Sequence, residues 1–309
     1  MNPPARACRP AARGLAGAGG GALMAAASMS CVQLGLALSV RLFDQLGPAG
    51  VAGLRLAWAG LLLVVLIRPR LRDFTGKGLL ACSMLGAVTA GMMLLFMLAV
   101  ARIPLGTASA LEFLGPLAVS LSGPGGGHRR WAAPAAVGVV LLTQPWDGGI
   151  NPAGLAFALA AGACWGAYIL LTQHVGDNVT GLTGLAVSIP VAGAIGILVA
   201  VPGLGRVTWQ LLAILLGLAV LHPVVTFSLE LQALRRLTAS AFGTLMSLEP
   251  AIALLAGLLV LRQVPGAPAA AGIILVVIAG VAATRTGGRA ATPDDHPGSK
   301  ASRGTQLPV

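Results

Sequence analysis

The chain has 309 residues, of which 56% are hydrophobic and only 9% are charged, and its mean hydropathy is +0.88. Soluble domains carry about 25% charged residues, so this composition excludes a soluble globular protein and predicts an all-α membrane protein. The net charge of +11 does not indicate nucleic-acid binding. The basic residues lie in short loops and tails, and they form no basic stripe interleaved with aromatic residues.

The two ends of the sequence differ in composition from the rest. Residues 1–20 combine three arginines with proline and glycine ahead of an apolar run. A signal peptide has a similar charge pattern, but the run that follows is about as long as a full membrane span. We therefore expect a disordered cytoplasmic tail over 1–20. The end of the chain, 284–309, is rich in glycine, proline, serine and charge and predicts a second such tail.

Ten apolar segments follow one another between the tails, and each is predicted to be a membrane-spanning helix. The fifth is shorter than the ~20 residues of a typical span, although Trp131 and Trp146 flank it as interface anchors. The predicted segments are Ala22–Leu42, Pro48–Ile67, Leu79–Val100, Pro104–Leu121, Trp131–Gln144, Pro152–His174, Leu182–Val201, Trp209–Leu229, Leu237–Leu261 and Ala267–Ala283.

An internal repeat relates the two halves of the chain at a constant offset of 134 residues. Pro116 matches Pro250 in the fourth and ninth segments, and Gly138 matches Gly272 in the fifth and tenth. Such repeats are typical of transporter folds. We interpret 21–146 and 147–283 as two five-helix transmembrane repeats, and an odd number of helices in each makes the two repeats inverted.

The distribution of basic residues supports this topology. With ten spans and a cytoplasmic N-terminus, fifteen lysines and arginines lie on the inner side and four on the outer side, with Arg55 inside the membrane. Inner loops of membrane proteins carry such an excess of positive charge. The sequence therefore predicts a multi-pass membrane protein, in contact with the lipid bilayer and with both termini cytoplasmic.

Three ionisable residues lie well within predicted spans: Glu249, Glu112 and Arg55. A charge at the membrane centre costs roughly 2.5–3.5 kcal/mol on insertion scales, so such residues face other helices or a wet cavity. Each glutamate has two interpretations. It binds a proton or a substrate ammonium group, or it bonds to backbone that Pro116 or Pro250 frees by kinking the helix.

Arg55 also has two interpretations: it binds a substrate carboxylate, or it pairs with one of the acids, because a buried charge requires a partner. Gln33 and Ser30 in the first segment, and Trp165 and Tyr168 in the sixth, add polar or amphipathic groups at mid-helix. We include Gln33, Trp165 and Tyr168 as candidate binding residues, although aromatic residues at helical spacing usually serve packing.

Two further polar residues are interpreted as structural. His222, which precedes Pro223, is expected to serve packing, and Glu230 is expected to be solvated near the inner interface. The four cysteines are scattered and form no CxxC pair, so the sequence predicts no metal site and no disulfide. It also contains no zinc-protease motif, phosphate-binding loop or other enzyme signature. We therefore expect no cofactor and no enzymatic activity.

The segments LEFLGP (111–116) and LMSLEP (245–250), within the two-copy layout, resemble the EamA-type transporters of the drug/metabolite transporter superfamily. Residues 31–56 and 233–257 are similar to its threonine/homoserine exporter branch. The resemblance implies ten helices in two inverted repeats, a central cavity, location in the bacterial inner (plasma) membrane, and export of amino acids or related metabolites coupled to protons. It places the family's membrane acids and arginine at Glu112, Glu249 and Arg55.

The second repeat departs from the first at two of these positions. Ile189 stands where Arg55 would repeat, and Met246 stands opposite Glu112. The two repeats are therefore not expected to carry identical sites.

The sequence thus predicts a secondary active exporter of a small-molecule substrate, of the threonine or homoserine type. Two alternatives stay open: an exporter of organic cations or drugs, with a glutamate as counter-charge, and an intramembrane enzyme or scaffold. The low aromatic content of 4% disfavours the first alternative, because aromatic faces often hold organic cations. The sequence leaves open whether the chain acts alone or as a homodimer.

Overall fold

The computed structural model describes residues 18–68, 74–122, 129–144, 150–178, 183–234, 236–237 and 239–286, and all regular secondary structure in these ranges is helical. Six helices are long and apolar enough to cross a membrane, and four shorter apolar helices of 10–17 residues accompany them. The all-α membrane protein predicted from composition is confirmed. Except for residues 18–20 and 284–286, the two predicted tails lie outside the described residues.

All ten predicted apolar segments contain helix. The α-helices are α1 (Ala18–Val40), α2 (Phe43–Ile67), α3 (Gly76–Val100), α4 (Leu105–Glu112), α5 (Leu114–Leu121), α6 (Ala132–Thr143), α7 (Pro152–Asn178), α8 (Thr183–Ala200), α9 (Trp209–Ala219), α10 (Thr226–Leu234), α11 (Ala239–Met246), α12 (Glu249–Leu261) and α13 (Ala267–Thr286). Short 3-10 helices, η2 (Arg129–Trp131) and η4 (Val201–Arg206), and a π-helix, η5 (Val220–Val225), complete the described structure.

Polar residues set several of the helix ends. Thr75 precedes α3 and its hydroxyl accepts a hydrogen bond from the amide of Gly78 at 3.1 Å. Thr208 caps α9 in the same way, through the amide of Leu211 at 3.3 Å. These caps satisfy backbone donors that a first helical turn leaves free. Beyond these caps, α3 and α9 are predominantly apolar.

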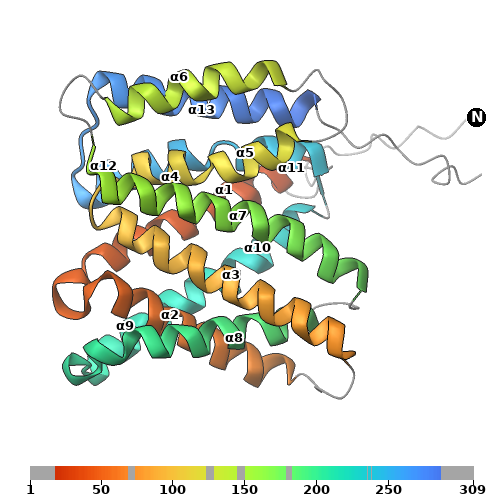
Figure 1. The fold of residues 1–309 in the computed structure, drawn as a ribbon, viewed down its shortest axis with the longest axis vertical. Coiled ribbons are helices and arrows are strands. Elements are labelled where there is room, and N and C mark those ends of the chain that lie inside the picture. The colour runs from red at the N-terminus through yellow and green to blue at the C-terminus, as the bar shows by residue number, and fades with distance from the viewer. Residues whose placement is uncertain are drawn as a thin grey trace, which may run out of the picture.

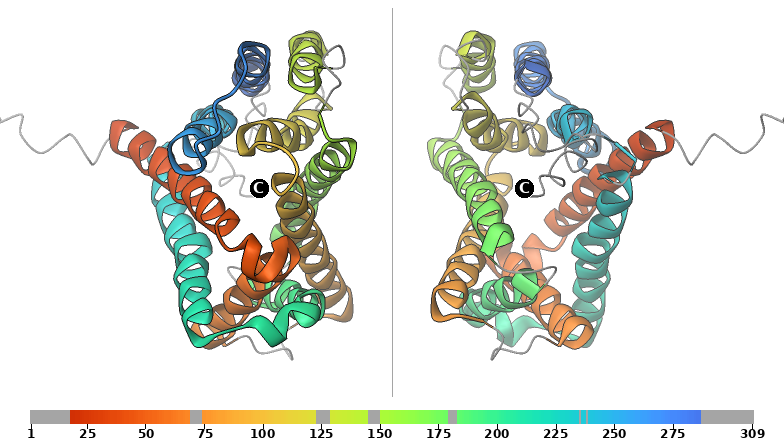
Figure 2. Two further views of the ribbon diagram at one scale, coloured as in Figure 1. Left: turned by 90° about the vertical axis from the view of Figure 1, so that its left-hand side faces the viewer. Right: turned by 90° about the vertical axis from the view of Figure 1, so that its right-hand side faces the viewer.

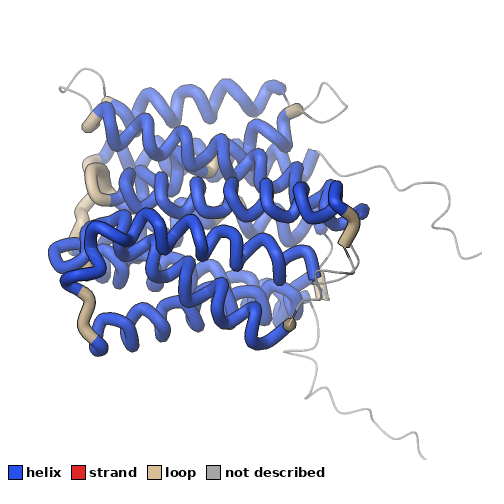
Figure 3. The backbone as a smooth tube through the Cα atoms, turned by 60° about the horizontal axis from the view of Figure 1, so that its bottom comes forward, coloured by secondary structure: helices blue, strands red, loops and turns tan. Residues whose placement is uncertain are grey.

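The helices run side by side in one bundle, and the connections lie at its two ends (Figures 1 and 3). Seen end-on, they surround a common centre (Figure 2). The main helix contacts are α2 with α8, α3 with α7, α6 with α13, α3 with α8, α1 with α10 and α4 with α12. Large apolar side chains such as Leu198 and Leu259 are 73% and 72% exposed. An outer surface of this kind is compatible with lipid and not with water.

Small residues allow the closest helix contacts. Gly138 of α6 and Gly272 of α13 face each other, and a Cβ on Gly138 would lie 2.9 Å from the carbonyl oxygen of Gly272. Gly196 of α8 packs as tightly on Gly53 of α2. Membrane helices commonly associate through such small residues, because packing replaces the hydrophobic effect as the attractive force.

Candidate functional site

Three of the predicted spans are interrupted, and each interruption lies close before a proline. The fourth span breaks at Phe113, before Pro116, and the ninth breaks at residues 247–248, before Pro250. Proline cannot donate a hydrogen bond to the carbonyl four residues earlier. That carbonyl belongs to Glu112 in one span and to Met246 in the other, two positions that are 134 residues apart.

The eighth span is interrupted at His222, whose φ of −137° and ψ of 101° are not helical. The next residue is Pro223, and a residue before proline is sterically disfavoured in the α conformation. Glu112 is the last residue of α4 and Glu249 the first of α12. Both predicted membrane acids therefore lie at helix interruptions, and a histidine lies at the third.

The acids line a cavity of about 260 Å³, which we call the acidic lobe. It is bordered by eight helices or helix segments from both halves of the chain. Its lining residues are Val32, Leu36, Met92, Met93, Phe96, Glu112, Trp165, Tyr168, His222, Thr226, Glu230, Met246 and Glu249.

A smaller cavity of about 110 Å³ adjoins it, and we call this the arginine lobe. It is lined by Arg55, Leu56, Ala59, Thr89, Met92, Met93, Tyr168, Ile189 and His222. The two lobes share Met92, Met93, Tyr168 and His222, so we treat them as one central cavity.

Two of the three glutamates in the acidic lobe accept hydrogen bonds from α1. The side-chain amide of Gln33 donates to Oε1 of Glu249 at 3.1 Å. The hydroxyl of Ser28 donates to Oε1 of Glu230 at 3.0 Å. The other amide atom of Gln33, Oε1, is buried and has no partner among the described residues. The lobe thus presents several acceptor oxygens, which suits a cationic group or a proton.

The arginine lobe has the opposite polarity. Arg55 is only 2% exposed. It donates from NH1 to the hydroxyl of Ser39 at 2.9 Å, and its NH2 lies 3.5 Å from Nδ1 of His222. Its Nε has no partner among the described residues. One of the two interpretations from the sequence was that Arg55 pairs with a glutamate. The structure shows no such pair, because neutral groups on α1 and at the α9–α10 interruption contact Arg55 instead.

The structure brings the predicted site residues together around this cavity. Glu249, Glu112, Trp165 and Tyr168 line the acidic lobe, and Tyr168 also lines the arginine lobe with Arg55. Gln33 reaches the site through Glu249. Trp165 packs edge-on against Phe113, the residue at the α4–α5 break, with ring centroids 6.1 Å apart.

Two residues that line the cavity were not among the candidates from the sequence. Glu230 was expected to be solvated near the interface, but it lines the cavity and bonds to Ser28. His222 was expected to serve packing alone, but it contacts Arg55 and lines both lobes. A usable signal was present: His222, Thr226 and Glu230 are spaced four residues apart, a spacing that predicts one face of a continuous helix.

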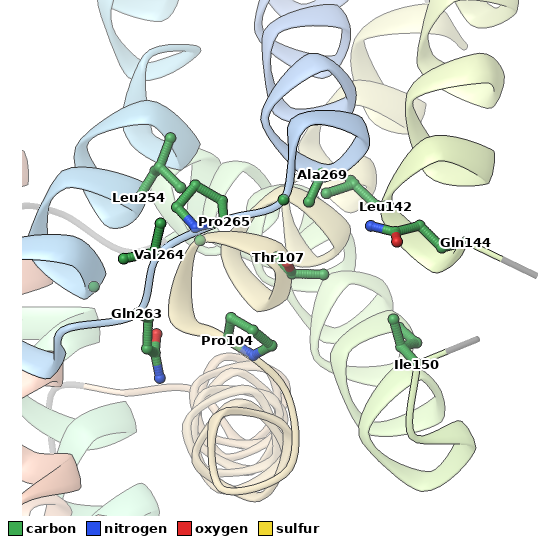
Figure 4. A pocket seen from close by; sticks show the side chains of 13 residues that line it. Pro104, Thr107, Leu142, Gln144, Ile150, Leu254, Gln263, Val264, Pro265 and Ala269 are labelled. Atoms are coloured by element: carbon green, nitrogen blue, oxygen red, sulfur yellow. The ribbon is translucent and has the colours of Figure 1, made fainter. Parts of the chain in front are cut away.

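A separate pocket of about 160 Å³ lies near the end of the bundle where α12 connects to α13 (Figure 4). Gln263 from this connection accepts a hydrogen bond from the amide of Leu105 at 2.9 Å, so it caps the start of α4. The pocket also contains Thr107 and Gln144 but no ionisable side chain. Among the described residues, no group of three or more His, Cys, Asp or Glu could hold a metal ion.

Comparison with known proteins agrees with this architecture. A model of the EamA-like transporter family matches residues 152–285. The threonine/homoserine exporters RhtA of Salmonella typhimurium (strain LT2) and Escherichia coli (strain K12) are each 38% identical over 245 residues, which cover 76% of this chain and 81% of theirs. The chain belongs to the EamA-like transporter family.

A solved structure, described only as a crystal structure of a protein, shares the fold of this EamA-like chain. It has a TM-score of 0.57 and 16% identity, and the match covers 86% of this chain and 98% of the other. Membership of the family makes this chain a multi-pass membrane transporter, and its curated relatives are transporters and not enzymes. The sequence-based assignment to this family is confirmed.

Proposed function

We propose that this chain is a secondary active exporter of small amino acids of the threonine or homoserine type, coupled to protons. The observation that carries the proposal is the central cavity, in which three glutamates and one arginine meet at interrupted helices. Interrupted helices at the middle of the membrane are typical of substrate and ion sites in secondary transporters. The two relatives that are 38% identical are threonine/homoserine exporters, which supports the substrate class.

The charge of the cavity favours a small amino acid over an organic cation. The two lobes enclose about 260 and 110 Å³, which together lie at the lower end of the range of about 300–1,000 Å³ for drug-sized ligands, so the charges decide between the two substrates. Arg55 lies in the adjoining lobe and would repel a purely cationic substrate. A small molecule with one positive and one negative group would find an opposite charge in each lobe.

We further propose that the cavity lies between two inverted five-helix repeats, 21–146 and 147–283. Several lining residues support this because they form pairs at the offset of 134 residues. Within the acidic lobe the pairs are Glu112 with Met246, Phe96 with Glu230, and Met92 with Thr226, and within the arginine lobe the pair is Arg55 with Ile189. Related positions of two repeats meet in one cavity when a pseudo-two-fold axis passes through it.

The helix contacts follow the same relation. The contact of α3 with α7 corresponds to that of α10 with α1, and the contacts of α2 with α8 and of α6 with α13 each join equivalent helices. The first described helix begins, and the last ends, at the same end of the bundle (Figure 1). An even number of spans with both termini on the cytoplasmic side is compatible with this arrangement and with the excess of basic residues there.

Purified protein in proteoliposomes tests the proposed function. Vesicles are loaded with radiolabelled threonine, homoserine, larger aromatic amino acids or an organic cation, and efflux is followed with and without a proton gradient. We expect saturable efflux of the small amino acids that the gradient accelerates, with protein-free vesicles as the control. Efflux of the organic cation without efflux of any amino acid would contradict the proposal.

A further inference from the structure

Arg55 is a buried cation without a counter-ion in the described protein. Its side chain is 2% exposed, and its contacts are with Ser39 and His222, which are neutral acceptors. A buried charge usually pairs with an opposite charge, because a lone one leaves much of its desolvation cost uncompensated. No described carboxylate forms an ion pair with Arg55. An anion that comes and goes with transport would supply the missing charge.

The contacts around Arg55 fix its guanidinium and leave Nε as the guanidinium nitrogen without a partner among the described residues. NH1 is held by Ser39, whose own hydroxyl donates to the carbonyl of Gly35 at 2.6 Å. NH2 is within 3.5 Å of Nδ1 of His222. Because arginine only donates, Nδ1 is the acceptor, and the neutral ring then carries its proton on Nε2. Nε of Arg55, which has no partner among the described residues, and Nε2 of His222 are both donors. Both residues line the arginine lobe.

We propose that Arg55 binds the carboxylate of the substrate while the acidic lobe binds its ammonium group. This inference rests on the proposed function and names the residue that sets its specificity. Guanidinium groups match carboxylates in shape and charge better than other side chains do. His222 and Ser39 are positioning residues, because they hold the guanidinium beside the cavity.

The lining of the arginine lobe implies a single orientation of the substrate. Ile189, which occupies the position of Arg55 in the second repeat, lines the same lobe. One side of the repeat axis therefore offers a cation and the other an apolar side chain. The carboxylate has one place to bind, and the ammonium group is directed toward Glu112, Glu230 and Glu249.

The test compares ligands that differ only in the carboxylate. Threonine and threonine methyl ester, which keeps the ammonium group but lacks the charged carboxylate, are titrated against purified full-length protein. Dissociation constants come from the concentration dependence of the ligand-induced rise in Tm. We expect the unsubstituted chain to prefer threonine. The preference should fall roughly tenfold to a hundredfold in Arg55→Gln, as for lost hydrogen bonds to a charged group.

Two further variants keep the test decisive if Arg55→Gln folds poorly. Arg55→Lys retains the positive charge without the planar fork, and should retain part of the preference for threonine over its ester. Ser39→Ala retains Arg55 but removes one of its two anchors, and should weaken threonine binding while binding of the ester stays unchanged.

The outcomes separate this inference from the proposed function. If threonine binds and is exported, but folded Arg55→Gln prefers threonine over its ester as strongly as before, the inference is wrong and the exporter function stands. If the unsubstituted chain binds the ester as tightly as threonine, the carboxylate is not recognised and the inference is likewise wrong. If the chain moves no amino acid, both proposals are wrong.

Discussion

Replacing Gly272 by alanine should weaken the packing of α13 on α6, which lie side by side in Figure 1. A Cβ at this position would lie 2.7 Å from the carbonyl oxygen of Gly138 and 2.9 Å from Cγ of Leu142. Favourable contacts between such atoms occur at about 3.5–4.0 Å. Because the closest neighbour is backbone and cannot rotate away, the two helices must move apart.

Two opposing effects determine how much Gly272→Ala changes the free energy of unfolding. Overpacking a close contact costs typically about 1–3 kcal/mol, and alanine gains up to about 1 kcal/mol over glycine in helix propensity. A matched control isolates the first term. Gly217 of α9 is exposed and a Cβ there meets no atom within 4 Å. We therefore expect Gly272→Ala to be about 1–3 kcal/mol less stable than Gly217→Ala.

The assay is equilibrium unfolding of the purified protein in mixed micelles with increasing denaturing detergent. Gly138→Ala should behave like Gly272→Ala, because its Cβ would lie 2.9 Å from the carbonyl oxygen of Gly272. Free energies of unfolding that are equal for Gly272→Ala and Gly217→Ala would show that the close contact of α6 and α13 does not exist as described.

Three further predictions concern transport and topology. Glu249→Gln keeps the shape and hydrogen bonding of the side chain but cannot bind and release a proton. Flux per folded molecule should therefore lose its dependence on the proton gradient and on pH. If flux depends on pH as in the unsubstituted chain, Glu249 has a structural role only. Gln33→Leu removes the hydrogen bond to Glu249 and should weaken threonine binding roughly tenfold. Ser122→Ala, at an exposed residue, is the control. Equal dissociation constants for threonine in the two variants would contradict a role for Gln33. Reporter domains fused before Ala18 and after Thr286 should both report a cytoplasmic position, and a periplasmic signal from either would refute the proposed topology.

Composition and hydropathy were sufficient to predict the fold class, because a lipid-facing helix must be apolar along its length and its backbone must be satisfied internally. The order of the apolar segments was predicted for the same reason. The helix breaks were predictable only in part. Pro116 and Pro250 marked two of them, whereas the break at His222 depends on the conformation before Pro223, and His–Pro in an apolar run was interpreted as packing.

The candidate site was harder to predict, because it depends on contacts between distant segments. Glu112, Glu249 and Arg55 were found because ionisable residues are rare in membrane helices. Their partners were not found. Gln33 and Glu249 are 216 residues apart, and Arg55 and His222 are 167 apart. Glu230 was expected to be solvated because it lies close to the inner end of its segment. Its spacing of four residues from Thr226, and of eight from His222, was the signal that it shares their face of the segment.

The unequal lining of the cavity has a consequence for the direction of transport. If two inverted repeats were identical, the outward-open and inward-open conformations would exchange the roles of the repeats and have equal free energies. Here Glu112 corresponds to Met246 at the offset of 134 residues, and Arg55 corresponds to Ile189. The two conformations then place different side chains at the open and closed ends, so the empty protein should rest predominantly in one of them. Each 1.4 kcal/mol of difference is about a tenfold bias in population, and substitutions at Met246 and Ile189 should shift that resting state without touching the charged residues.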